Sequence, residues 1–91
     1  MKGQAKTSTK QARISSPEQA FGYALRNIRN ERKVSQEALA HIGGFHRTYI
    51  GQLERGEKSP SLRTIFALAG SLEVDPYKLV RATERILSGG S

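Results

Sequence analysis

The stretch from Ser35 to Gly56, which reads SQEALAHIGGFHRTYIGQLERG, decides the fold of this chain. It predicts two short helices joined by a tight turn. Ser35 is a suitable N-cap because its hydroxyl can accept a free backbone N–H of the first helical turn, and residues 36–42 are good helix formers. Gly43 and Gly44 end this helix, since glycine readily adopts the left-handed conformation that a sharp reversal needs.

A second helix is predicted over residues 47–55 and is closed by Gly56. Ile50 and Leu53 form its inward face, as Leu39 and Ala40 do for the first helix, and Phe45 is expected to plug the corner between the two. The outer face of the second helix is expected to carry Arg47, Thr48, Gly51, Gln52 and Arg55. Such a stripe of donors, acceptors and one glycine is suited to lie against the edges of bases.

The spacing within this stretch is more specific than any single residue. Counting Gln36 as one, alanine falls at five (Ala40), glycine at nine (Gly44), and apolar residues at four, ten, fifteen and eighteen. With Ile28-Arg29 before it and Pro60-Ser61-Leu62 after it, the stretch resembles the helix-turn-helix of the Cro/phage-repressor (XRE-type) family of DNA-binding proteins. The resemblance covers roughly residues 21–80.

The remaining segments predict three more helices. Ser16-Pro17-Glu18 is a typical helix start, and that helix is expected to end near Arg32 or Lys33. Ser61 can cap a fourth helix, and Asp75-Pro76 starts a fifth that runs to about Leu87. The apolar stripe expected at the centre of the core is Leu62, Ile65, Phe66, Ala69 and Leu72. The sequence therefore predicts an all-α fold of five helices, and the resemblance implies a lambda-repressor-like domain.

Ninety-one residues are expected to form one domain, over residues 16–87. Residues 1–15 contain four basic residues and no acid, so we expect a disordered basic N-terminal arm. Such an arm can reach along DNA phosphates, or it can be a solvated tail. Residues 88–91 are expected to form a flexible C-terminal end.

Fifteen Lys and Arg residues oppose eight acids, which gives a net charge of +7. Such an excess favours a polyanionic partner, most simply nucleic acid, although solubility alone is the alternative. The chain has no cysteine, so disulfides and thiolate metal sites are excluded. It has no apolar run of membrane-spanning length and no apolar segment of a secretory signal, so we expect a cytoplasmic protein of bacterial or phage origin without a membrane partner.

The resemblance assigns roles to the second helix of the motif. Arg47, Thr48 and Gln52 match the base-reading positions of the family. Arginine can bond guanine O6 and N7, glutamine can bond adenine N6 and N7, and the threonine methyl can touch the thymine methyl. Phosphate contacts are expected from Gln36, His46, Tyr49, Lys58 and Ser59. Two of these stay open, since Tyr49 can instead pack at the edge of the motif and His46 can merely end the turn.

Two further pairs are predicted to be structural. Arg29 and Glu54 match a pair that is buried and ion-paired in the family, where it ties the first helix to the recognition helix; two separate surface charges are the alternative. Ile86 and Leu87 are late apolar residues that a small core does not need. We expect them to form a dimer interface that sets two recognition helices about 34 Å apart, one turn of DNA.

No catalytic set is apparent. His41 and His46 are five residues apart, which is off the spacing that places two metal ligands on one helical face. We therefore expect no enzyme, no cofactor and no small-molecule ligand. The sequence predicts a sequence-specific regulator of transcription that binds double-stranded DNA at a palindromic operator as a homodimer, with repression as the expected mode. The alternative is a protein-interaction adaptor, similar to bridging factors, that uses the same helical surface; Arg47, Gln52 and the positive charge favour DNA.

Overall fold

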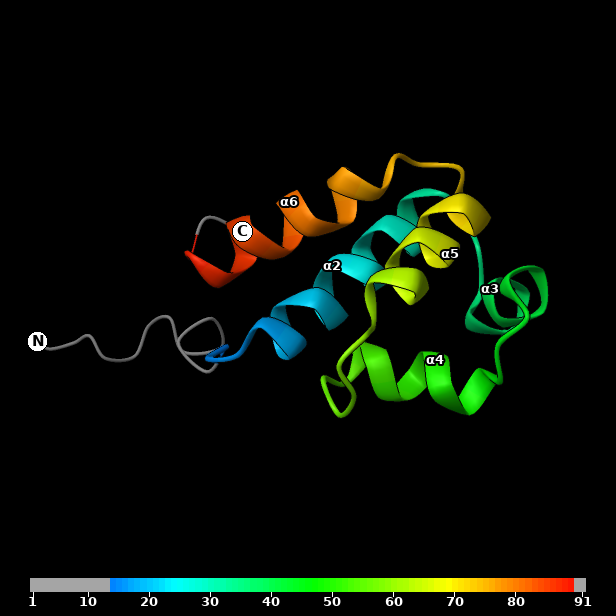
Figure 1. Cartoon of the computed structure of the whole chain (residues 1–91), viewed down its shortest axis with the longest axis horizontal. Coiled ribbons are helices and arrows are strands. Elements are labelled where there is room, and N and C mark those ends of the chain that lie inside the picture. The colour runs from blue at the N-terminus through cyan, green and yellow to red at the C-terminus, as the bar shows by residue number, and fades with distance from the viewer. Residues whose placement is uncertain (1–13, 90–91) are drawn as a thin grey trace, which may run out of the picture.

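The computed structural model describes residues 14–89 and contains five helices and no strand within that range (Figure 1). They are α2 (Pro17–Glu31), α3 (Gln36–Gly43), α4 (Arg47–Glu54), α5 (Leu62–Leu72) and α6 (Pro76–Leu87). Helix α2 packs against α6 and α4, and α3 packs against α4 and α5. This confirms the predicted all-α, five-helix fold. The predicted N-terminal arm lies almost wholly outside the described residues, as does the last part of the C-terminal end.

The helix boundaries follow from local signals in the sequence. The hydroxyl of Ser16 accepts the backbone N–H of Gln19 at 3.1 Å, and Ser35 and Ser61 cap α3 and α5 in the same way, each at 3.0 Å. Gly44 ends α3 in the left-handed conformation, with φ +74°. Both motif helices therefore begin and end within one residue of the prediction, and the turn between them is the one that Gly44 permits.

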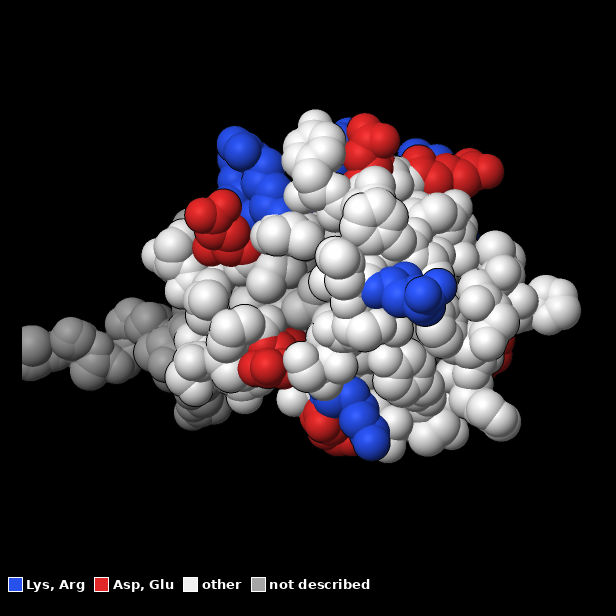
Figure 2. Space-filling view, viewed as in Figure 1, with Lys and Arg blue, Asp and Glu red and all other residues white. Residues whose placement is uncertain are grey.

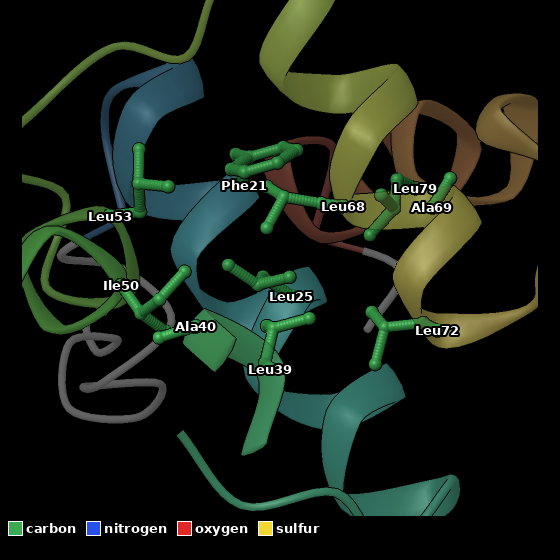
Figure 3. Packing of buried hydrophobic residues seen from close by; sticks show 10 residues of the cluster. All are labelled: Phe21, Leu25, Leu39, Ala40, Ile50, Leu53, Leu68, Ala69, Leu72 and Leu79. Atoms are coloured by element: carbon green, nitrogen blue, oxygen red, sulfur yellow. The ribbon is translucent and has the colours of Figure 1, made fainter. Parts of the chain in front are cut away.

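The core lies between all five helices (Figure 3). It contains the four residues that the motif was expected to bury, two from α3 and two from α4. The buried cluster consists of Phe21, Leu25, Leu39, Ala40, Ile50, Leu53, Leu68, Ala69, Leu72 and Leu79. Phe45 is half-buried and packs against this cluster. The helix-turn-helix is therefore held on the body of the protein by its inward face.

The expected core stripe of α5 was wrong at two positions. Leu62 is 70% exposed and Phe66 is 57% exposed. Ala69 and Leu72 are buried as expected, and the helix also buries Leu68, which was not part of the expected stripe. Helix α5 is apolar on two adjacent faces, and α3 and α6 cover only the face that carries Leu68. Periodicity alone cannot choose between two faces that share Ala69.

Helix α4 approaches α2 closely at Gly22, which is buried. A Cβ atom added to Gly22 would stand 2.6 Å from the carbonyl oxygen of Leu53. No real Cβ tolerates that contact, so only glycine lets the two backbones come this near. The close crossing fixes where α4 lies against the body, and with it the direction of the outer face of α4.

None of the helices within residues 14–89 has both the length and the apolar character to cross a membrane.

Candidate nucleic-acid interface

The outer face of α4 presents the three predicted base-contacting residues. Arg47 and Thr48 are exposed, and Gln52 is half-buried. The buried residues Ile50 and Leu53 lie on the opposite side of the helix. These three polar side chains therefore share one helix and one side of the motif, as a surface that reads base edges requires.

Gly51 lies on this outer face, as expected, but it is not exposed to solvent. Gly51 is buried, because the side chain of Arg55 lies over it. A Cβ atom at Gly51 would meet Arg55 Nη1 at 3.0 Å. Arg55 in turn donates from Nε to Glu57 Oε2 at 2.7 Å, and this hydrogen bond lowers the pKa of the Glu57 carboxyl. In the free protein the Arg55 head is therefore paired within the chain.

Arg47 also has a carboxylate partner. Its Nε lies 2.9 Å from Oε2 of Glu37, which stands in the first turn of α3. Both side chains are largely exposed, at 61% and 65%. The ion pair therefore spans the turn of the motif and joins the starts of its two helices. Sequence reasoning missed Glu37 and Glu57 as partners, since nothing local to either residue indicates which arginine it faces.

Arg29 and Glu54, the two residues that the resemblance pairs, are in contact. Arg29 Nε donates to Glu54 Oε2 at 2.6 Å, and Nη2 donates to Oε1 at 3.0 Å. The side chains are only 10% and 5% exposed. Arg29 Nη1 also donates to the carbonyl oxygen of Val34 at 3.0 Å. This buried fork joins α2 to the last turn of α4 and to the segment that precedes α3.

Gln36, expected to contact phosphate, is part of the same network. Its Nε2 donates to Glu54 Oε1 at 2.9 Å. An amide nitrogen carries two hydrogens, so one remains to donate elsewhere. Gln36 is also the first residue of α3, where backbone N–H groups point out of the helix end. The side chain is thus held in place while it keeps a donor.

The other predicted phosphate-contacting residues flank α4. His46 occupies the N-cap position but makes no side-chain capping bond, and it is exposed. Lys58 and Ser59 are exposed in the loop between α4 and α5. Tyr49 is half-buried, with its ring centroid 5.6 Å from that of Phe45. The Tyr49 ring therefore packs at the edge of the motif, and its phosphate contact stays a prediction.

The predicted dimer residues lie at the end of α6, far from α4 in Figure 1. Ile86 is half-buried and Leu87 is 41% exposed. Residues 14–89 contain no group of three His, Asp or Glu side chains that could hold a metal ion. The polar and cationic side chains that could contact DNA therefore lie on α4 and beside it, at a different place from the predicted dimer residues.

Two short helices that bury their inward faces, and of which the second presents a polar outer face, define a helix-turn-helix DNA-binding domain. Residues 25–79 match the family model described as Helix-turn-helix. The chain is 46% identical to the control protein C.SmaI of Serratia marcescens over 56 residues, which are 62% of this chain and 67% of that protein. It is 41% identical to the control protein C.BamHI of Bacillus amyloliquefaciens over 64 residues, 69% of this chain and 79% of that protein.

Among solved structures, the crystal structure of the restriction-modification controller protein C.AhdI from Aeromonas hydrophila matches with a TM-score of 0.65. The two chains are 41% identical, and the match covers 67% of this chain and 92% of C.AhdI. The chain therefore belongs to the helix-turn-helix family. It is a transcriptional regulator of that family, as predicted, and the comparisons give no support to the adaptor alternative.

Proposed function

We propose that this chain binds a palindromic operator in double-stranded DNA as a homodimer and represses transcription there by occupying the site. The observation that carries the proposal is the outer face of α4, where Arg47 and Thr48 are exposed beside Gln52. Phosphate contacts would set the register, and α4 would read the major groove. The activity would take place in the cytoplasm, on the nucleoid of a bacterium or on phage DNA, and it needs no catalytic group and no cofactor.

The regulated genes are proposed to be those of a restriction–modification system. C.SmaI and C.BamHI are control proteins, and C.AhdI is a restriction-modification controller. Selection of bound duplexes from a random pool should recover an inverted repeat that also occurs upstream of this chain's own gene and of an endonuclease or methyltransferase gene. A recovered site that occurs only before unrelated genes would remove this assignment and leave DNA binding intact.

The base-reading role is tested by substitutions on the exposed face. Arg47→Ala and Gln52→Ala leave Ile50 and Leu53 in place, and alanine is a good helix former, so folding should survive. Each should cost about 1–3 kcal/mol of specific binding and relax the preference at one base pair per half-site. The readout is a repeat of the random-pool selection with each variant.

Lys58→Ala is the matched control for these substitutions, because Lys58 is exposed in the loop beyond α4. It should weaken binding to all sequences alike and make the salt slope shallower by about one unit. Base-reading residues change which sequence is preferred, whereas phosphate-contacting residues change only how tightly DNA binds. If the Arg47 and Gln52 variants keep wild-type selection, α4 is not the reading helix.

The proposed dimer interface includes more than the predicted residues Ile86 and Leu87. Ile65 and Val80 line one hollow, which the start of α2 and the loop before α5 also border, and Val80 is 51% exposed. Leu62 and Phe66 are exposed on the same helix as Ile65. Figure 2 shows few charged side chains on the face over α5. Several exposed apolar residues on one helix and in the hollow beside it are typical of a surface that another protein covers, and a second copy of the chain fits the proposed palindromic operator.

Analytical sedimentation of the wild type and of single variants measures the oligomeric state, and the variants that become monomeric identify the interface. The wild type should be a dimer at high micromolar concentration. Phe66→Glu should give a monomer if the α5 face is covered, and Leu87→Glu should do so if the end of α6 is covered. Arg63→Glu, an exposed position beside Leu62, is the control for added negative charge. A wild-type chain that stays monomeric both free and on DNA would overturn the dimer.

A further inference from the structure

We propose that Glu37 positions Arg47 for base recognition and so helps determine the sequence preference of α4. The inference rests on the proposed function, in which Arg47 reads a base. Its starting observation is the 2.9 Å separation between Arg47 Nε and Glu37 Oε2. The two residues are ten positions apart and come from different helices of the motif. The contact therefore depends on the turn geometry, not on the helix that carries Arg47.

The contact is compatible with base recognition because Glu37 approaches only one side of the Arg47 guanidinium. A guanidinium has an Nε side and a terminal pair, Nη1 and Nη2, and it can form two parallel hydrogen bonds from either. Glu37 lies against Nε. Within residues 14–89 no hydrogen bond engages the terminal pair, which can therefore donate to O6 and N7 of a guanine. The carboxylate thus restrains the arginine without taking the atoms that the base needs.

Restraint matters because an arginine side chain loses much rotamer freedom when it is fixed on a base. If Glu37 already holds Arg47 in the free protein, Arg47 loses less rotamer freedom when DNA binds. This advantage exists only if Glu37 holds the guanidinium in the direction in which it meets the base. The Glu37 carboxylate also repels nearby phosphates, whatever the DNA sequence. Positioning therefore predicts two opposite effects of removing the charge: weaker discrimination at one base pair, and unchanged or tighter binding to nonspecific duplex.

The second arginine pair of the motif provides an internal contrast. Glu57 accepts from both Nε and Nη2 of Arg55, at 2.7 Å and 3.3 Å. That carboxylate covers a bidentate edge of the guanidinium, so it blocks Arg55 from using this edge on DNA. Glu57→Gln also removes one negative charge close to α4 and does not touch Arg47. It is the matched control for Glu37→Gln, and it should change affinity without changing base preference.

The experiment uses the full chain and an operator selected from a random duplex pool. The base pair that Arg47 reads is identified first, as the operator position at which the Arg47→Ala variant no longer prefers one base pair over the others. Dissociation constants are then measured for the operator, for the operator altered at that base pair, and for a nonspecific duplex. Glu37→Gln should reduce discrimination at that base pair about two- to fivefold, the range expected of an exposed ion pair. Combining it with Arg47→Ala should cause no further loss of discrimination.

Each other result contradicts the proposal in a distinct way. Discrimination that stays unchanged or rises in Glu37→Gln means that Glu37 is a mere surface partner or a competitor of the base. A similar loss in Glu57→Gln means that charge, not position, is responsible. If Arg47→Ala itself changes no preference, the proposed base-reading role of Arg47 fails and positioning fails with it. A purely structural effect of Glu37→Gln would appear as a lower thermal midpoint with all DNA affinities reduced alike.

Discussion

The buried fork between Arg29 and Glu54 should make each residue costly to replace alone and cheap to replace together. With side chains only 10% and 5% exposed, neither charge is screened well by water. Among the partners within residues 14–89, Glu54→Leu leaves the Arg29 cation with only the Val34 carbonyl, and Arg29→Met leaves the Glu54 carboxylate with only Gln36. Breaking one partner of such a pair typically costs about 3–5 kcal/mol of folding free energy.

The double variant should recover most of that loss, because no unpaired charge stays buried. It still leaves the Val34 carbonyl without the Arg29 donor, at a cost of about 1–3 kcal/mol if water cannot replace it. The half-buried Gln36 side chain can turn to solvent. We therefore expect roughly 1–3 kcal/mol for Arg29→Met combined with Glu54→Leu, well below the sum of the single changes.

Urea unfolding followed by helical circular dichroism measures these differences. For a domain of this size the slope is roughly 1 kcal/mol per molar urea, so each single change should lower the midpoint by about 3–5 M or unfold the protein outright. Arg32→Met is the control, since Arg32 pairs with Glu73 at 3.4 Å with side chains 45% and 81% exposed. It should shift the midpoint by under about 1 M. Single changes at Arg29 and Glu54 that cost no more than this control would refute the reasoning.

Three further predictions concern backbone approach and the N-terminal arm. Gly22→Ala should lower stability by about 1–3 kcal/mol or more in thermal unfolding, because the new Cβ meets the Leu53 carbonyl oxygen at 2.6 Å; an unchanged midpoint would contradict the close crossing. Gly51→Ala should instead raise stability by about 0.5–1 kcal/mol, because only the flexible end of Arg55 stands near; a loss would show that Arg55 cannot move. Removing residues 1–15 should make the salt dependence of DNA binding shallower, and an unchanged slope identifies a solvated tail.

The sequence predicted those features that local chemistry determines. Ser16, Ser35 and Ser61 begin helices because each hydroxyl satisfies a backbone N–H that no helical carbonyl reaches. Gly44 permits the turn through its positive φ. The spacing of the apolar residues from Leu39 to Leu53 indicates which residues face inward where the two motif helices cross. Each of these signals is complete within a few residues or within the motif, so no knowledge of the rest of the fold is needed.

The sequence failed where the answer depends on segments that are distant along the chain. Residues 62–69 read LRTIFALA, which offers more apolar surface than α3 and α6 can cover, and the exposure of Leu62 and Phe66 follows from where those helices lie. The partners of Arg47 and Arg55 were likewise not predictable. A carboxylate ten residues away and one two residues away look alike in sequence, and only the turn geometry brings Glu37 to Arg47.

Glu54 joins the helix that we assign to base reading, α4, to the Gln36 side chain that we assign to phosphate contact. It accepts hydrogen bonds from Arg29 on α2 and from Gln36 at the start of α3, while it belongs to the last turn of α4. A shift of α4 against α2 would therefore also move the donor that we assign to phosphate. Because the same carboxylate holds the reading helix and the Gln36 side chain, loosening it should weaken binding to every sequence together. Loosening the Glu37 contact, in contrast, should weaken discrimination at the one base pair that Arg47 reads, while binding to nonspecific duplex stays unchanged or tightens.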